Sequence, residues 1–361
     1  MESYEQYMEL QERQNNEEQD NVTSTIPPAD IVAFNELRSC ADLKRMCDKC
    51  QIDLDPDFQR GEVWKNRAQT LFVDSLMKQL PIPSMCVSLD LHTNKRYVID
   101  GLQRITTINK FLSDDNWTLS KIDDVDERIS GKKVGEIKKT YPNLYDLIEN
   151  VTIPITIIRC DYTKNDHMQY LFQIFYRLNS GGNKLYNQEI RNCIYQGSFN
   201  TLLKNLAVSD GWLAFSKATP QKVKESRFSH EERILRFFAF YNNYENYKGK
   251  FASFLNDYMR DHVNITEQEE VEYRDLLENT LDIANKIENF TTSKNAAEAI
   301  LVGIAKNLQQ LKDLDDISLS FLYQKTIDLP EFAEEALKDG LGAQEKVKSR
   351  IANAIETFSR D

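Results

Sequence analysis

The chain has 361 residues, of which 41% are hydrophobic and 28% are charged, and its formal net charge is −12 at pH 7. This balance is that of an ordinary globular protein, and the length suffices for one elaborated domain or for two. The acidity argues against a protein that grips duplex DNA over its whole surface, because that mode of binding needs many Lys and Arg contacts to phosphate. A local basic groove remains compatible with the composition.

The sequence shows no sign of export or membrane insertion. No run of uncharged apolar residues is long enough to cross a bilayer, and residues 1–5 lack the basic and then apolar order of a signal peptide. Cys47 and Cys50 form a Cys-x-x-Cys pair with Cys40 nearby, but no local fourth ligand follows, so a structural zinc site is not favoured. We expect a cytoplasmic protein without membrane contact.

The first third of the chain changes from a polar arm to a globular pattern. Residues 1–25 are acidic, rich in glutamine and poor in apolar side chains, which predicts a flexible arm. From Ile31 onward the pattern predicts a helix at 41–47, a strand at 51–54 and a buried helix after Trp64. Residues 81–83 (Pro-Ile-Pro) end that helix, and the next two expected elements are strands that pair with each other, at 85–89 and 97–100.

The second of these strands runs through an Asp-Gly turn into an amphipathic helix. Gly101 allows the turn, and the start of the helix presents unpaired backbone N–H groups and the positive end of the helix dipole. The polar side chains available as donors there are those of Gln103, Arg104, Thr106 and Thr107. The pattern fits a phosphate-binding turn, although Asp-Gly followed by Arg is by itself also typical of a plain surface turn.

The middle of the chain holds a polar excursion and then more regular elements. Residues 114–150 form either a lid or a plain insertion, 151–160 predict a strand at or near a sheet edge, and a helix follows through Leu178. Glu189, Arg191 and Asn192 lie in the first turns of the next predicted helix. Either at least one of them contacts the site or orients Arg104, or they form an internal ion pair that holds two helices together.

From about residue 198 the sequence predicts helices only. Residues 229–232 and 266–269 both match the capping-box pattern that precedes a helix. A dense run of Phe and Tyr between residues 237 and 247 is more typical of a helical core than of a base-stacking surface.

Three ordered motifs carry a resemblance to a known family. They are Asp57-Phe58-Gln59-Arg60 with Trp64, then Ile99-Asp100-Gly101-Leu102-Gln103-Arg104 with Thr106-Thr107, then Phe175-Tyr176-Arg177-Leu178-Asn179-Ser180-Gly181-Gly182 with Glu189-Ile190-Arg191-Asn192. Together they resemble the N-terminal domain of GmrSD-type, modification-dependent restriction enzymes, over roughly the first two hundred residues. The usual family motif is Asp-Gly-Gln-Gln-Arg, so Leu102 stands in place of its first glutamine.

The resemblance implies a fold and its division along the chain. The fold is of the α+β class: a ParB/sulfiredoxin-like small mixed sheet with helices, followed by an all-α C-terminal domain. We therefore expect the nucleotide-binding domain at 26–197 and the helical domain at 198–361, after the arm at 1–25.

The resemblance also implies a site that binds a nucleoside triphosphate together with Mg²⁺. The residues that it assigns to catalysis are Asp100, Gln103 and Arg104, with Asp100 also holding the metal directly or through water. Those that it assigns to nucleotide binding are Gln59, Arg60, Gly101, Thr106, Thr107, Asn179 and Arg191.

The expected function is a sensor or regulatory module of a GmrSD-like restriction or phage-defence system that binds and hydrolyses a nucleoside triphosphate. The four histidines are widely separated and give no HNH nuclease motif, so we expect any cutting to come from a nuclease subunit in trans, with DNA as a further partner. No P-loop motif is present. Two alternatives remain: a metal-dependent DNA nuclease in which Asp100, Glu62 or Glu189 holds the metal, and a non-enzymatic DNA or protein adaptor.

Overall fold

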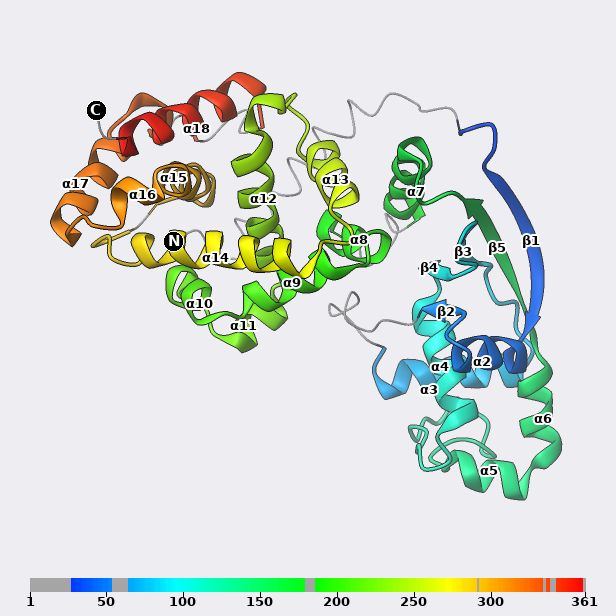
Figure 1. Cartoon of the computed structure of the whole chain (residues 1–361). Helices are drawn as coiled ribbons and strands as arrows, with labels where there is room; N and C mark the ends of the chain where they lie inside the picture. Colours follow the sequence, from blue (N-terminus) through cyan, green and yellow to red (C-terminus); the bar gives the residue numbers. More distant parts are fainter. Residues whose placement is uncertain are drawn as a thin grey trace. The chain divides into compact units, whose positions relative to one another are not determined.

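A computed structural model describes residues 27–53, 64–178, 186–290, 292–333, 336–337 and 342–359. The chain divides into a sheet unit, Ile26–Tyr186, and a helical unit that begins at Asn187 (Figure 1). This division falls before residue 198, where the sequence places the start of the helical domain, because helix α8 (Asn187–Ile194) packs with the helices that follow it. The predicted arm at 1–25 lies outside the described residues.

The sheet unit is built on a five-stranded mixed sheet with the order β1-β5-β3-β4-β2. Its strands are β1 (Val32–Ser39), β2 (Ile52–Asp53), β3 (Met85–Asp90), β4 (Arg96–Asp100) and β5 (Thr152–Cys160). β3 and β4 pair antiparallel as predicted, whereas β3 pairs with β5 and β4 pairs with β2 in parallel. The α+β class expected from the sequence is thereby confirmed.

Helices cover this sheet from several segments of the chain. They are α2 (Cys40–Asp48), α3 (Asn66–Met77), α4 (Leu102–Ser113), α5 (Val134–Thr140), α6 (Pro142–Asn150) and α7 (Asn165–Leu178). Helices α2, α3 and α4 lie together, and α7 packs against β4 (Figure 1). Apolar residues at helical spacing on α4, namely Leu102, Ile105, Ile108 and Phe111, are all buried, which fixes the polar face of that helix outward.

The excursion at 114–150 is a packed insertion with its own apolar side chains. Trp117, Leu119 and Ile122 are buried, and the backbone N–H of Ser120 donates a hydrogen bond to Thr70 Oγ1 of α3 at 2.8 Å. The buried face of α3 thus includes Thr70, whereas Leu71 is 41% exposed.

The sheet has one strand that the sequence analysis did not predict. β1 pairs antiparallel with β5 along its whole length and occupies the edge of the sheet, so β5 lies next to the edge. Three apolar residues of β1 remain largely exposed, namely Val32, Phe34 and Leu37, the last at 69%. Such a half-solvated pattern is a weak strand signal, which is why it was missed.

The part of the helical unit that the structure describes contains no strand. Its helices are α8, α9 (Ser198–Ala207), α10 (Asp210–Ser216), α11 (Pro220–Glu225), α12 (Ser229–Asn243), η2 (Tyr244–Asn246), α13 (Phe251–Asp261), α14 (Glu267–Ala284), α15 (Lys294–Lys306), α16 (Leu308–Leu311), α17 (Asp316–Ile327), η3 (Pro330–Phe332) and α18 (Gln344–Phe358). Within the described ranges, no helix is both long enough and apolar enough to span a membrane.

The run of Phe and Tyr between residues 237 and 247, which the sequence predicts to be part of a helical core, belongs to the core of the helical unit. Phe237, Phe238, Phe240 and Tyr247 are completely buried and pack edge to face and at tilted angles against one another and against neighbouring rings. Of the two predicted capping boxes, that at Thr266 is present.

The capping box predicted at residues 229–232 is wrong. Ser229 already lies inside α12, and the N-cap is Phe228 in a left-handed conformation with φ 65°, which offers no side-chain oxygen to the helix.

A candidate site at the turn from β4 to α4

The turn between β4 and α4 depends on a glycine for two separate reasons. Gly101 is the N-cap of α4 and has φ 102°, in the left-handed region that other residues rarely adopt. A Cβ atom placed there would lie 2.6 Å from Met85 Cγ of the neighbouring strand β3. The chain therefore needs glycine both for its backbone conformation and for close packing against β3.

The two charged residues of the motif lie side by side across this turn. Asp100 is the last residue of β4, and its Oδ2 atom accepts a hydrogen bond from Arg104 Nη2 at 2.7 Å. Arg104 Nη1 donates a second bond to the backbone oxygen of Pro83 at 2.5 Å. The Asp100 side chain is 44% exposed and that of Arg104 13%. The guanidinium is thus fixed in place by contacts with two segments, while the carboxylate still faces solvent.

The first turn of α4 presents backbone donors beside this pair. The N–H of Ile105 makes the first helical bond, to the oxygen of Gly101, at 3.0 Å. No side chain caps the start of α4, so the N–H groups of Leu102, Gln103 and Arg104 precede the first helical bond. A helix start of this kind, next to a half-exposed ion pair, is chemically suited to an anion such as phosphate.

Gln103 connects this turn to the beginning of α3. Its Oε1 atom accepts a hydrogen bond from the backbone N–H of Trp64 at 2.9 Å. Trp64 directly follows the segment that contains Gln59 and Arg60, which lie outside the described residues. Gln103 therefore joins the two motifs in which the sequence analysis placed the site.

The two threonines of the motif differ in their surroundings. Thr106 is partly exposed, whereas Thr107 is fully buried and donates its hydroxyl to the backbone oxygen of Gln103 at 2.7 Å. Thr107 therefore faces the interior of the sheet unit and stabilises the first turns of α4 from the buried side of the helix. Asn179, the remaining predicted site residue of the segment after α7, lies outside the described residues.

Arg191 lies in the helical unit and is 1% exposed. Its Nε atom donates to Gln188 Oε1 at 3.1 Å, and its Nη2 atom lies 3.3 Å from Glu232 Oε2 of α12. Glu189 is paired in the same way with Arg227, at 2.6 Å. Of the two roles considered for this segment, these contacts are those of an internal ion pair that holds helices together.

No cluster of three or more His, Cys, Asp or Glu side chains with the geometry to hold a metal ion occurs among the described residues. Burial raises the pKa of the Cys40 thiol to about 12 and that of Cys47 to about 11, so both remain protonated at neutral pH. Glu62, considered as a metal ligand of a nuclease, lies outside the described residues.

The sequence analysis did not identify two residues that contact this turn. Met85 closes the space beside Gly101, and the carbonyl of Pro83 holds Arg104. The Pro81-Ile82-Pro83 sequence predicted only the end of a helix, and nothing in it shows which carbonyl meets the guanidinium. A bulge between Cys86 and Val87, opposite Asp100, also lies at this point of the sheet, and bulges are frequent beside functional sites.

The fold and the turn define an α+β domain with a strand–glycine–helix turn that carries an Asp–Arg pair. Residues 43–196 match the family model of the GmrSD restriction endonuclease, N-terminal domain. Neither a search of the curated proteins nor a search of the solved structures found a match. This match suggests a module of the restriction or phage-defence type within residues 43–196.

Proposed function

We propose that the sheet unit binds a nucleoside triphosphate at the β4–α4 turn and hydrolyses it, as the sensor or regulatory module of a GmrSD-like restriction system. The observation that supports this most is the placement of Asp100 and Arg104 on either side of a left-handed Gly101, at the open start of a helix. Backbone donors, a cation and a solvent-facing carboxylate are then available at one point of the surface.

Each residue of the turn has a role in this proposal. The N–H groups at the start of α4 and the Arg104 guanidinium bind phosphate oxygens, because both are donors and the guanidinium is permanently charged. Only two of the five guanidinium N–H groups have partners among the described residues, so Arg104 can bind a ligand without releasing Pro83. Gln103 orients a phosphate oxygen or the attacking water.

Asp100 fits a magnesium ion that arrives with the nucleotide. One of its carboxylate oxygens is bonded to Arg104, and the side chain is 44% exposed, which leaves the other oxygen accessible to solvent. Mg²⁺ is usually held by one or two carboxylates together with substrate phosphates and water, and it would neutralise charge on the phosphate oxygens. DNA and a nuclease subunit in trans complete the proposed system as partners.

A second candidate function is that of a non-enzymatic adaptor whose turn is purely structural. The observation in its favour is that Gln103 and Arg104 both bond to other segments of the same unit, at Trp64 and Pro83. In that case Gln103 and Arg104 would hold the loops around α4 in place. Substitution of Gly101 does not discriminate between the two functions, because the conformation and packing of this residue are required in either.

The discriminating experiment is the binding and turnover of ATP, GTP, CTP and UTP with Mg²⁺ by the wild type and by Arg104→Ala. We expect saturable binding of at least one triphosphate, weakened at least tenfold in the variant, since charge-assisted bonds contribute about 1.5–3 kcal/mol each. Phosphate release should also fall in Gln103→Ala. Binding of no triphosphate by the wild type, or an unchanged Kd in Arg104→Ala, would favour the adaptor.

Arg128→Ala is the matched control. Arg128 forms a similar pair with Asp126, at 2.8 Å, in the same unit but on the insertion. Both variants remove an arginine that is bonded to an aspartate, so general effects of lost charge are shared. Circular dichroism of each variant should match the wild type, because exposed and half-exposed pairs contribute little to stability.

A further inference from the structure

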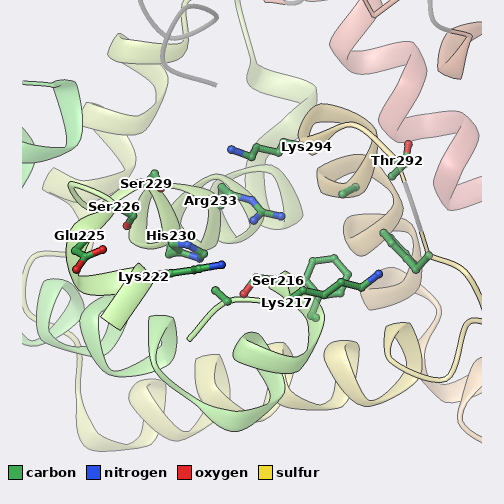
Figure 2. Close-up of a pocket in the computed structure, with 14 residues that line it drawn as sticks. Ser216, Lys217, Lys222, Glu225, Ser226, Ser229, His230, Arg233, Thr292 and Lys294 are labelled. Carbon is green, nitrogen blue, oxygen red and sulfur yellow. The ribbon is translucent and has the colours of Figure 1, made fainter. Parts of the chain in front are cut away.

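The helical unit contains a pocket that the proposed function does not use. It has a volume of about 550 Å³, within the range typical of small-molecule sites. Its walls come from the end of α10, from α11, from the first turns of α12 and α15, and from the segment between α14 and α15 (Figure 2). All of its lining residues belong to one unit.

The lining of this pocket is strongly cationic. Four cationic side chains line it, Lys217, Lys222, Arg233 and Lys294, against a single carboxylate among the described lining residues, that of Glu225. Glu225 already accepts a hydrogen bond from Gln221. This local excess of positive charge is opposite in sign to the net charge of the whole chain, which is −12. It indicates an anionic ligand.

His230 adds a neutral donor at the centre of this cluster. Its Nδ1 atom accepts a hydrogen bond from Trp212 Nε1 at 2.9 Å, so the proton of the neutral ring lies on Nε2. Burial, together with the charges of Arg233 and Lys294, lowers the pKa of His230 to about 3, which keeps the ring neutral at physiological pH. Figure 2 shows the imidazole close to Lys222 and Arg233.

The pocket also offers apolar surface and a polar atom without a described partner. Phe215 and Phe290 line it and contact each other edge to face, with ring centroids 5.1 Å apart. Ser216 Oγ is buried, and it has no hydrogen-bond partner in the part of the chain that the structure describes. The lining thus combines cations and hydrogen-bonding groups with an aromatic wall, which suits a ligand that carries both phosphate and a flat ring.

We propose that this pocket is a second, separate binding site, for the phosphate group and base of a nucleotide, with Lys222, Arg233 and Lys294 on the phosphate and Phe215 and Phe290 against the base. The nucleotide is either free or the 5′-phosphorylated end of a strand, because the two share this chemistry. The site does not depend on the β4–α4 turn.

Trp212 provides a direct optical readout. It donates to His230 and lies under Arg233, whose guanidinium carbon is 5.0 Å from the centre of the indole ring. The other tryptophans, Trp64 and Trp117, belong to the sheet unit. In a Trp64→Phe/Trp117→Phe chain, Trp212 is the one remaining tryptophan, so a change in its fluorescence emission reports binding at the pocket. Adding Arg104→Ala removes the contribution of ligand binding at the β4–α4 turn. The probes are AMP, ATP, inorganic phosphate, and a pentathymidylate with and without its 5′-phosphate.

Lys222→Glu and Lys224→Glu form a matched pair for this titration. Both lysines are exposed on α11, but only Lys222 lines the pocket. We expect saturable quenching by a nucleotide probe that weakens at least tenfold in Lys222→Glu and stays within twofold in Lys224→Glu. Preference for AMP over the phosphorylated oligonucleotide assigns a free nucleotide, and the reverse preference assigns a strand end. No saturable change with any probe, equal losses in both variants, or equal affinity for inorganic phosphate and AMP would overturn the proposal.

Discussion

The two units place the same chemical pair, an arginine and a carboxylate, in opposite surroundings. At the β4–α4 turn, Asp100 is 44% exposed and its partner Arg104 lies at the start of a helix. In the helical unit, Arg191 and Glu232 are 2% and 6% exposed, and Arg236 joins them from one turn further along α12. A pair that faces solvent can exchange one partner for a ligand at little cost, whereas a buried pair cannot lose a partner without leaving an uncompensated charge.

The largest expected effect comes from the buried pair. Glu232→Ala removes the buried carboxylate between Arg191 and Arg236, and removing one member of a buried ion pair costs about 3–5 kcal/mol. Asp100→Ala makes the same change at the turn and should cost less than about 1 kcal/mol, as exposed pairs do. Urea unfolding followed by circular dichroism compares the two. A smaller decrease in the free energy of unfolding for Glu232→Ala than for Asp100→Ala would contradict the distinction between the buried pair and the exposed pair.

The second effect concerns the backbone of the turn. Gly101→Ala should destabilise the sheet unit by roughly 2–5 kcal/mol, since a left-handed alanine costs about 1–2 kcal/mol and overpacking about 1–3 kcal/mol. Hydrogen exchange of the α4 amides measures this unit separately. Combination with Met85→Ala should recover part of the loss, because the Cγ atom 2.6 Å from the new Cβ is then gone.

Gly211→Ala is the control for Gly101→Ala. Gly211 lies in α10, where a Cβ would meet Leu281 only at an ordinary distance of 3.6 Å. It should change stability by less than about 1 kcal/mol, towards a gain, because alanine reduces the freedom of the unfolded chain. Equal losses at the two glycines would show that Gly101 has no special role.

A third effect is the dependence of stability on pH, which differs between the two units. Because the pKa of His230 is lowered from 6.5 to about 3, the unfolded chain binds a proton on this residue below pH 6.5 while the folded chain does not. The stability that depends on neutral His230 is present above pH 6.5 and is lost as the pH falls towards 3, by at most about 1.4 kcal/mol per pH unit.

Two carboxylates of the sheet unit, those of Asp30 and Asp161, have lowered pKa values. Lys164 and His167 hold the pKa of Asp30 at about 2, and Thr163 holds that of Asp161 at about 2, so their contributions are lost only as the pH falls from 3.8 towards 2. Unfolding measured between pH 6.5 and 4.5 should therefore show a slope that decreases in His230→Gln, which keeps an acceptor for Trp212. A slope unchanged by this substitution would contradict the buried, neutral imidazole.

The order of elements around the turn could be predicted because its signals are local. The apolar run at Val98 and Ile99, the Asp-Gly dipeptide and the helical spacing from Leu102 to Ile108 are all contained in a dozen residues. The strand, the turn and the helix are confirmed, and so is the packed core of the helical unit.

The features that could not be predicted from the sequence depend on contacts between segments that are distant along the chain. β1 was missed because its exposed apolar residues become part of a strand only by pairing with β5, more than a hundred residues later. The place of α8 follows from the pairing of Glu189 with Arg227 and of Arg191 with Glu232, and sequence alone left this open against a role at the site. The cationic pocket likewise combines side chains from four helices.

The most direct test of the central claim is calorimetric binding of the four nucleoside triphosphates with Mg²⁺ to the wild type, Arg104→Ala and Lys222→Glu. The proposed function predicts that one triphosphate binds the wild type, that Arg104→Ala loses this binding at least tenfold while its circular dichroism is unchanged, and that Lys222→Glu retains the site at the turn. Equal affinity in the wild type and Arg104→Ala, with any loss confined to Lys222→Glu, would contradict nucleotide binding at the turn and leave the helical pocket as the nucleotide site.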